Sequence, residues 1–242
     1  MPSKSALGLV HSIQTLATLD GPGVRYAVFL QGCPLRCACC HNPDTWEENG
    51  EGYYPASELV EQALRYREYF GNAGGVTLSG GEPLLQAAFA EDFFRRAREA
   101  GLNTCLDTSG YLLSDEVKAL LSVTDRVLLD IKYPNDEDYR AYVGCSLDAP
   151  LAFLDYLNET GIKTTLRTVV IPTRNDTREH EDFLSSLVST HSSIDTVECL
   201  PFRKLCTVKY EKMGIPFRFA HVPEASKSAV KEMQDRISKF LH

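Results

Sequence analysis

Long hydrophobic runs are missing from this 242-residue sequence, as are a basic charge excess, low-complexity tracts and an evident linker. Because no apolar stretch approaches the roughly 20 residues that span a bilayer, we expect no membrane helix. The formal net charge of −8 argues against a nucleic-acid partner. The first ten residues carry one lysine and no cleavable signal pattern, so we expect a cytoplasmic protein.

What is present is the composition of an ordinary globular chain, with 43% hydrophobic and 24% charged residues. Without a linker or a strong internal repeat, we expect residues 1–242 to form a single domain with a sizeable core. The eight cysteines of such a chain favour reduced thiols over a disulfide framework. Cys105 and Cys199 lie in apolar runs and are expected to be small core residues.

Short β-branched runs alternate with longer helical patterns along the chain. The strand-like runs are 24–31, 76–79, 103–108, 126–131, 163–171 and 196–200. The helical patterns cover 57–70, 84–100, a short stretch opened by Ser114, 149–160, 177–190 and 224–241. Several strands are almost continuously apolar, which is typical of parallel strands buried on both faces.

Six strand-then-helix units predict an α/β fold with right-handed crossovers and a parallel sheet. Six units are fewer than the eight of a closed barrel, so we expect a partial, open (β/α)6 TIM-like barrel. Its site would lie at the carboxyl ends of the strands. A doubly wound sheet is the alternative, which the sequence alone separates poorly from an open barrel.

Polar groups follow or close each predicted strand. They are a cysteine-rich loop, Gly80-Gly-Glu-Pro83, Asp107-Thr-Ser-Gly110, Asp130-Ile-Lys132, Arg167 and Arg203. Each has an ordinary explanation, since glycines suit turns, aspartates accept backbone bonds and an arginine can keep its head in water. Because the carboxyl ends of parallel strands meet at one edge of a sheet, the six together favour a shared site.

The cysteine-rich loop at 31–46 contains Cys33, Cys37 and Cys40 with C-x3-C-x2-C spacing. Cysteine thiolates are the usual ligands of iron–sulfur clusters, and a four-iron cube normally takes four of them. Three thiolates would leave one iron open to a substrate or cofactor. A four-thiolate zinc site that includes Cys39 is the alternative. It is disfavoured because neighbouring cysteines seldom reach one metal without strain and no distant C-x2-C is present.

Cys33-x3-Cys37-x2-Cys40, followed by Gly80-Gly-Glu-Pro83, resembles the radical S-adenosylmethionine (SAM) superfamily. Further segments resemble the glycyl-radical-enzyme activases of that superfamily that act on pyruvate formate-lyase. These segments are Asp20-Gly-Pro-Gly-Val-Arg25, Cys40-His-Asn-Pro-Asp-Thr-Trp46, Leu106-Asp-Thr-Ser-Gly110, Leu129-Asp-Ile-Lys132 and Leu200-Pro-Phe202. The resemblance extends from His11 to the last helix, which is nearly the whole chain.

The resemblance implies a site as well as a fold. Cys33, Cys37 and Cys40 would bind a [4Fe–4S] cluster whose fourth iron is chelated by the amino and carboxylate groups of SAM. The residues implied around SAM are Gly80, Gly81 and Glu82 at its amino group, Cys39, Cys40 and His41 beside the adenine, and Asp130, Ile131, Lys132, Arg167 and Arg203 along the remainder of the pocket. The implied ligands of a monovalent cation, Na+ or K+, are Asp107, Thr108, the Leu128 carbonyl and Asp130.

The implied reaction is reductive cleavage of SAM to a 5′-deoxyadenosyl radical, which takes a hydrogen atom from a glycine Cα of pyruvate formate-lyase, a dimeric glycyl radical enzyme. No side chain of this chain is required as a general acid or base. The resemblance implies a flavodoxin or ferredoxin as electron donor, and we expect a monomer. The sequence departs from the pattern at Cys39, where the superfamily commonly has an aromatic residue, and at Arg203, where related activases have histidine.

Other functions stay open on the sequence alone. One is an activase of a different glycyl radical enzyme, although many such activases carry an inserted segment with further cysteines and residues 47–75 contain none. Another is a radical SAM enzyme that acts on a small molecule without a protein partner. The third is an electron-carrying or structural iron–sulfur protein, which would not need Asp107, Asp130 and Glu82 to converge on the cluster.

Overall fold

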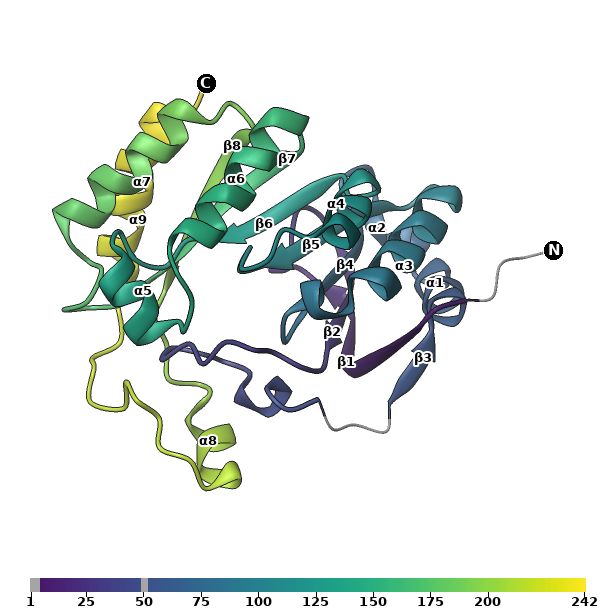
Figure 1. Cartoon of the computed structure of the whole chain (residues 1–242), viewed down its shortest axis with the longest axis horizontal. Helices are drawn as coiled ribbons and strands as arrows, with labels where there is room; N and C mark the ends of the chain where they lie inside the picture. Colours follow the sequence, from purple (N-terminus) through teal and green to yellow (C-terminus); the bar gives the residue numbers. More distant parts are fainter. Residues whose placement is uncertain (1–4, 49–51) are drawn as a thin grey trace. The chain divides into compact units, whose positions relative to one another are not determined.

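The computed structural model describes residues 5–48 and 52–242 (Figure 1). Its backbone forms two compact units, each assembled from separate stretches of the chain. The first unit comprises the residues up to Pro34, Thr45–Thr108 and Leu112–Leu128, and the second comprises Leu35–Asp44, Ser109–Tyr111 and Leu129–His242. The expectation of a single domain stays a prediction.

All six predicted strands are present, with boundaries within two residues of those expected at most ends. They are β2 (Arg25–Leu30), β4 (Gly75–Gly80), β5 (Asn103–Thr108), β6 (Arg126–Asp130), β7 (Lys163–Val170) and β8 (Ile194–Pro201). Parallel registers join β2 to β4, β4 to β5, and β7 to β8. The first three residues of β6 belong to the first unit and its last two to the second.

The strand order is β3-β1-β2-β4-β5-β6-β7-β8, so the six parallel-type strands follow one another in the order of the sequence. A doubly wound sheet has a point where the order of its parallel strands reverses, and β2, β4, β5, β6, β7 and β8 have no such point. The expected α/β fold with an open, mostly parallel sheet of six β/α units is therefore confirmed.

Two strands in the first unit were not predicted. β1 (Leu7–Ala17) pairs antiparallel with β2, and its first residues pair antiparallel with β3 (Tyr53–Pro55). Only Gly8, Leu9, Val10 and Ala17 of β1 are buried, because the strand lies toward the edge of the sheet, and its later apolar residues Ile13 and Leu16 are not buried. Its sequence therefore lacks the apolar alternation that marks a half-buried strand.

The helices of the first unit pack around a core to which Phe93 and Phe94, both 0% exposed, contribute. They are α1 (Ala56–Leu64), α2 (Arg67–Phe70), α3 (Ala87–Glu99) after the 3-10 turn η2 (Pro83–Gln86), and α4 (Asp115–Ser122). The helix expected at 57–70 is interrupted at Tyr66, whose backbone is not helical. Ser114 caps α4 as expected, with its hydroxyl accepting a hydrogen bond from the Val117 amide.

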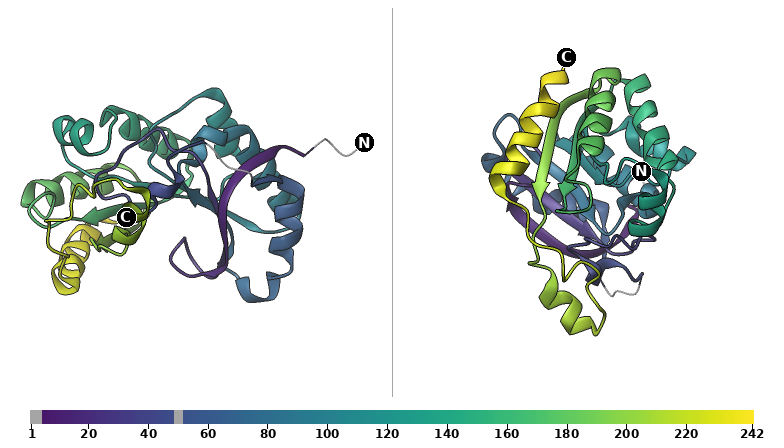
Figure 2. Two further views of the ribbon diagram at one scale, coloured as in Figure 1. Left: turned by 90° about the horizontal axis from the view of Figure 1, so that it is seen from below. Right: turned by 90° about the vertical axis from the view of Figure 1, so that its left-hand side faces the viewer.

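The second unit carries five helices among its described residues. They are α5 (Asp136–Tyr142), α6 (Asp148–Thr160), α7 (Arg178–Thr190), α8 (Thr207–Met213) and α9 (Lys227–Ile237), the last continued by the 3-10 turn η3 (Ser238–Phe240). Helices α5 and α8 were not predicted. Figure 2 shows α9 running alongside β8. Cys105 in β5 and Cys199 in β8 are buried, so their core positions are confirmed.

The short 3-10 turn η1 (Pro43–Thr45) closes the cysteine-rich loop. Within the described ranges, no helix has the length and apolar character needed to cross a membrane.

Candidate active site

The turn after β4 places two glycines against the base of the cysteine-rich loop. Gly80 has φ of 106°, and a Cβ there would lie 2.4 Å from the Leu30 amide nitrogen. At Gly81 a Cβ would lie 2.1 Å from the carbonyl oxygen of Gly32. Neither position has room for a side chain, so the tight backbone turn by itself requires both glycines.

The same close approach fixes Glu82. The Gly81 amide donates to the Leu30 carbonyl and the Glu82 amide donates to the Gly32 carbonyl, both at 2.8 Å. Glu82 is only 2% exposed, and its Oε1 accepts hydrogen bonds from the Thr108 hydroxyl (2.6 Å) and the Leu84 amide (3.2 Å). A buried, oriented carboxylate of this kind suits an ammonium group.

Asp107 and Thr108 close β5, next to β4 in the sheet. The Ser79 hydroxyl of β4 donates a 2.8 Å hydrogen bond to Asp107 Oδ2. Leu128, whose carbonyl was predicted as a cation ligand, is a buried residue of β6 in the same unit. The first unit thus brings Glu82 and Thr108 into direct contact and orients Asp107 through a serine that the sequence analysis did not single out.

In the second unit, backbone hydrogen bonds join the cysteine-rich loop to the last residue of α5 and to the residue that follows this helix. The Ala38 amide donates to the Tyr142 carbonyl at 2.7 Å, and the Arg36 amide donates to the Val143 carbonyl at 3.1 Å. A turn follows, closed by the Cys40 amide donating to the Cys37 carbonyl at 3.0 Å. These bonds hold Cys37 and Cys40 at the two ends of one tight turn.

Next in the turn, the Asn42 amide points at the sulfur of Cys40, with the nitrogen 3.4 Å from Sγ. Hydrogen bonds to cluster sulfurs are one of the ways in which a protein tunes an iron–sulfur site. The side chains of Cys33, Cys37 and Cys40 are partly accessible, and none of the three is in a disulfide. Thiol side chains with a backbone N–H directed at one sulfur are the chemistry that a cluster requires.

Within residues 5–48 and 52–242, no group of three or more His, Cys, Asp or Glu side chains is arranged so that it could hold a metal ion. Cys33 belongs to the first unit, and Cys37 and Cys40 to the second.

Cys39 differs from its neighbours because it is buried, at 8% exposure. Burial raises the pKa of its thiol to about 11, an effect that the nearby charge of Lys132 only partly offsets. In this unit Cys39 is therefore a neutral thiol, unlike the deprotonated form that binds metals.

Asp130, at the end of β6, is held between two cations. Lys132 Nζ lies 2.6 Å from its Oδ2, and Arg167 Nε of β7 lies 3.1 Å from its Oδ1. Burial alone would raise the pKa of Asp130, but the two cations outweigh it and lower the pKa to about 2. Burial likewise opposes the charge of Lys132, and Asp130 outweighs it, so the pKa of Lys132 lies well above its ordinary value.

Ile131 continues the same strand end, fully buried, and its amide donates to the Arg167 carbonyl at 2.8 Å. Asp130, Ile131, Lys132 and Arg167 thus lie together in one cluster, and their assignment to a SAM pocket stays a prediction. That both basic side chains bind Asp130 was not foreseen.

Arg203 reaches the loop through its backbone. The His41 ring Nε2 lies 3.0 Å from the Arg203 carbonyl oxygen. The Arg203 guanidinium instead donates to the Ala225 carbonyl at 2.7 Å and lies 3.6 Å from a Glu224 carboxylate oxygen. The structure therefore brings His41 and Arg203 together, but with the arginine head directed toward residues 224 and 225.

Two residues of α8 that the sequence analysis left out also hold the loop. The Tyr210 hydroxyl donates to the Cys40 carbonyl at 3.2 Å. Lys209 Nζ donates to Asn42 Oδ1 and to Asp44 Oδ1, each at 2.9 Å. No local sequence signal identifies them, because they lie about 170 positions from the loop in the chain.

Arg25, from the Asp20–Arg25 segment that supported the resemblance, has a structural role. It is 0% exposed and lies at the amino end of β2, away from the strand ends discussed above. Its guanidinium donates to the Thr77 hydroxyl at 3.0 Å and to Asn103 Oδ1 at 2.8 Å. It ties β2, β4 and β5 together.

Comparisons with known proteins agree with these features. The model of the radical SAM superfamily matches residues 27–185. Pyruvate formate-lyase-activating enzyme of Clostridium pasteurianum is 37% identical over 236 residues, covering 97% of this chain and 99% of that protein. Pyruvate formate-lyase 1-activating enzyme of Escherichia coli K12 is 35% identical over 241 residues, covering 98% of each chain.

Solved structures support the fold. A radical SAM methyltransferase from Sphaerobacter thermophilus superimposes with a TM-score of 0.64 at 18% identity, covering 89% of this chain and 64% of that one. A domain of pyruvate-formate lyase-activating enzyme from Bacteroides vulgatus superimposes with a TM-score of 0.56 at 16% identity, covering 69% of this chain and 94% of that one.

Proposed function

Because this chain belongs to the radical SAM superfamily, and within it to the pyruvate formate-lyase-activating enzymes, we propose that it installs a glycyl radical on pyruvate formate-lyase. Members of the superfamily use a [4Fe–4S] cluster and SAM as cofactors. The observation that carries the proposal is the near full-length similarity to activating enzymes, combined with a cysteine loop whose Cys40 sulfur receives a backbone N–H.

The cluster ligands in this proposal are Cys33, Cys37 and Cys40. When bound, the cluster would supply the electron for reductive cleavage of SAM, which would provide the 5′-deoxyadenosyl radical that takes a hydrogen atom from the partner's glycine. The chain's own residues bind and orient SAM and exclude water from the radical.

The methionine part of SAM is a zwitterion, with an ammonium group and a carboxylate. Glu82, oriented by Thr108 and Leu84, suits the ammonium group. Lys132 and Arg167 bring two positive charges against the single negative charge of Asp130, which leaves an excess suited to a carboxylate.

The remaining assignments follow from the resemblance. Gly80 and Gly81 would present backbone carbonyls to the ammonium, and Cys39, Cys40 and His41 would lie beside the adenine. The cation site would use Asp107, Thr108, the Leu128 carbonyl and Asp130. Among these ligands Asp130 has the least support, because each of its oxygens already binds a cationic side chain. Arg203 acts through His41 in this proposal, as a positioning residue.

We further propose a cytoplasmic monomer that forms a single domain and receives its electron from a flavodoxin or ferredoxin. The eight cysteines support the location, since none is in a disulfide and reduced thiols persist in the cytosol.

The decisive experiment adds SAM and reductant to the anaerobically reconstituted protein together with pyruvate formate-lyase and records an EPR spectrum. The proposal predicts a glycyl-radical doublet and one 5′-deoxyadenosine for each radical formed. SAM cleavage without the doublet would reassign the protein to another glycyl radical enzyme or to a small-molecule substrate. Failure to cleave SAM at all would leave an electron-carrying or structural role.

A pair of cysteine variants tests the ligand set. Cys40→Ala removes a thiolate and should abolish the cluster, whereas Cys39→Tyr should retain it. Iron and sulfide content after reconstitution measure both. Equal iron loss in the two variants would refute the three-ligand assignment.

A further inference from the structure

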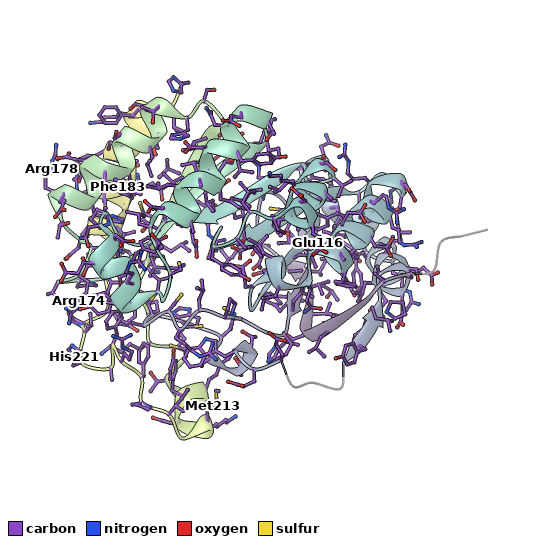
Figure 3. The ribbon with its side chains drawn as sticks, in the orientation of Figure 1. Glu116, Arg174, Arg178, Phe183, Met213 and His221 are labelled. Atoms are coloured by element: carbon purple, nitrogen blue, oxygen red, sulfur yellow. The ribbon has the colours of Figure 1, made fainter. Side chains whose placement is uncertain are left out.

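The α8 segment exposes large apolar side chains next to the cysteine loop. Leu205 is 81% exposed, Val208 56% and Met213 38%. Figure 1 and the right-hand view of Figure 2 show α8 lying apart from α6, α7 and α9 of the same unit, and Figure 3 labels Met213, the last residue of α8. Apolar groups gathered on one exposed surface commonly mark a contact site.

Basic residues surround this apolar surface. Between residues 203 and 218 the chain has five basic residues and one acidic residue, a local charge of +4 (five minus one), whereas the whole chain carries −8. Two of the five are partly neutralised, because Arg203 lies 3.6 Å from a Glu224 oxygen and Lys209 lies 2.9 Å from an Asp44 oxygen. Lys212 and Arg218 are exposed, and Lys209 has a partly exposed side chain. A positive surface on a negative protein orients an acidic partner as it approaches.

The inner side of α8 contacts the loop that carries a predicted cluster ligand. Tyr210, 3% exposed, donates its hydroxyl hydrogen to the Cys40 carbonyl at 3.2 Å. Lys209 binds Asn42 and Asp44 of the same loop. The helix therefore has one side bonded to the cysteine loop and carries exposed apolar and basic side chains beside it.

We propose that Leu205, Val208, Lys212 and Met213 form the docking surface for a small, acidic one-electron carrier protein. The proposal rests on the proposed function, since it requires a cluster at Cys40. The carrier loses one electron and the cluster gains one, with no bond made or broken. The surface offered by a short helix and its flanking residues is small, and transient electron-transfer interfaces are likewise smaller in area than stable ones.

A carrier fits better than the glycyl radical enzyme as the occupant. Electron transfer requires close approach to the cluster-bearing loop, and α8 bonds directly to that loop through Tyr210 and Lys209. The basic side chains of this stretch also suit an acidic carrier.

The test compares a triple variant, Leu205→Ser, Val208→Ser and Lys212→Glu, with a matched control, Lys239→Glu and Phe240→Ser. The control changes an exposed lysine and a 50% exposed phenylalanine on η3 of the same unit. Stopped-flow absorbance follows cluster reduction by fully reduced flavodoxin at two salt concentrations, and by dithionite. Iron content and circular dichroism establish that each variant is folded and loaded.

The proposal predicts at least a tenfold lower second-order rate with flavodoxin for the triple variant, a weaker salt dependence, and unchanged rates for the control. Reduction by dithionite should be the same in all three proteins.

Two results would overturn the proposal. An unchanged flavodoxin rate would remove the docking role, and an equal slowing with dithionite would mean that the substitutions damage the cluster site itself. A normal flavodoxin rate with a lower glycyl-radical yield under dithionite would assign the surface to the glycyl radical enzyme, again against the proposal. Rapid reduction of the parent protein without any glycyl radical on pyruvate formate-lyase would instead refute the proposed function and leave the docking surface standing.

Discussion

Glu82 in the first unit and Asp130 in the second are acidic residues at the carboxyl ends of strands, but the donors described around them differ. The hydrogen bonds described for Glu82 come from a hydroxyl and a backbone amide, which orient the carboxylate. Asp130 is bound by the cationic side chains of Lys132 and Arg167. Two acidic residues at strand ends are therefore held by different kinds of donor.

Under the proposed function, Glu82 would contact the ammonium group of SAM, whereas Asp130 would organise the side chains of Lys132 and Arg167. Substitutions at the two carboxylates should therefore have different effects.

Asp130→Asn should destabilise the protein most. It leaves Lys132 and Arg167 buried without their anion, and removing one partner of a buried ion pair costs about 3–5 kcal/mol. Urea unfolding monitored by circular dichroism measures the loss. Asp235→Asn is the control, because its exposed pair with Lys231 should contribute no more than about 0.5 kcal/mol. Similar losses in the two variants would show that Asp130 is not a buried organising anion.

Glu82→Gln should weaken SAM binding while sparing the fold. The amide oxygen can still accept from Thr108 and Leu84, but the charge is gone, and a charge-assisted hydrogen bond is worth about 1.5–3 kcal/mol. That corresponds to roughly 10–100-fold weaker binding of SAM to the reconstituted protein, measured by equilibrium binding. Unchanged affinity would mean that Glu82 does not contact the ammonium group.

Thr108→Val should have a smaller effect on the same measurement. It removes the 2.6 Å hydrogen bond that orients Glu82, at a cost of about 1 kcal/mol, or roughly fivefold in SAM affinity. In the double variant with Glu82→Gln, the two losses should be less than additive because both act on one carboxylate. Full additivity would show that Thr108 acts independently of Glu82.

The pH dependence should be the mildest effect at working conditions. The pKa of Asp130 is lowered to about 2 in the folded protein, against about 3.9 in an unfolded chain. A lowered folded pKa stabilises fully above the unfolded pKa, so this contribution is constant from pH 8 to 5 and declines as the pH falls from about 4 toward 2. The stability difference between parent and Asp130→Asn should follow that course in urea titrations at pH 8, 5 and 3. A difference that grew below pH 4 would have the wrong sign.

The elements that could be predicted are those whose burial gives the local sequence a run or a periodic pattern of apolar residues. The strands β4 to β7 are mostly buried and were found near their true bounds. Strand β1 and helices α5 and α8 were missed because few of their side chains are buried, with Tyr139 the buried residue of α5 and Tyr210 that of α8. A short element without an apolar face has no periodicity to detect.

The candidate site divides in the same way. The glycine turn and the strand-end aspartates are visible as local motifs, and Lys132 follows two positions after Asp130. The pairing of Arg167 with Asp130 depends on how β7 lies against β6, and the support of Cys40 by Tyr210 depends on how α8 packs on the loop. Neither long-range arrangement leaves a pattern within one stretch of sequence.

The hydrogen bond from the Glu82 amide to the Gly32 carbonyl joins the turn after β4 to the residue directly before Cys33. The hydrogen-exchange rate of the Glu82 amide should therefore depend on the rigidity of both the turn after β4 and the start of the cysteine-rich loop. If cluster insertion makes the cysteine loop more rigid, hydrogen exchange at the Glu82 amide should slow even before SAM is added. The exchange rate of this amide would therefore report whether the cluster has been inserted. Exchange measured on a peptide spanning residues 80–84 would then report the fraction of protein molecules that contain the cluster.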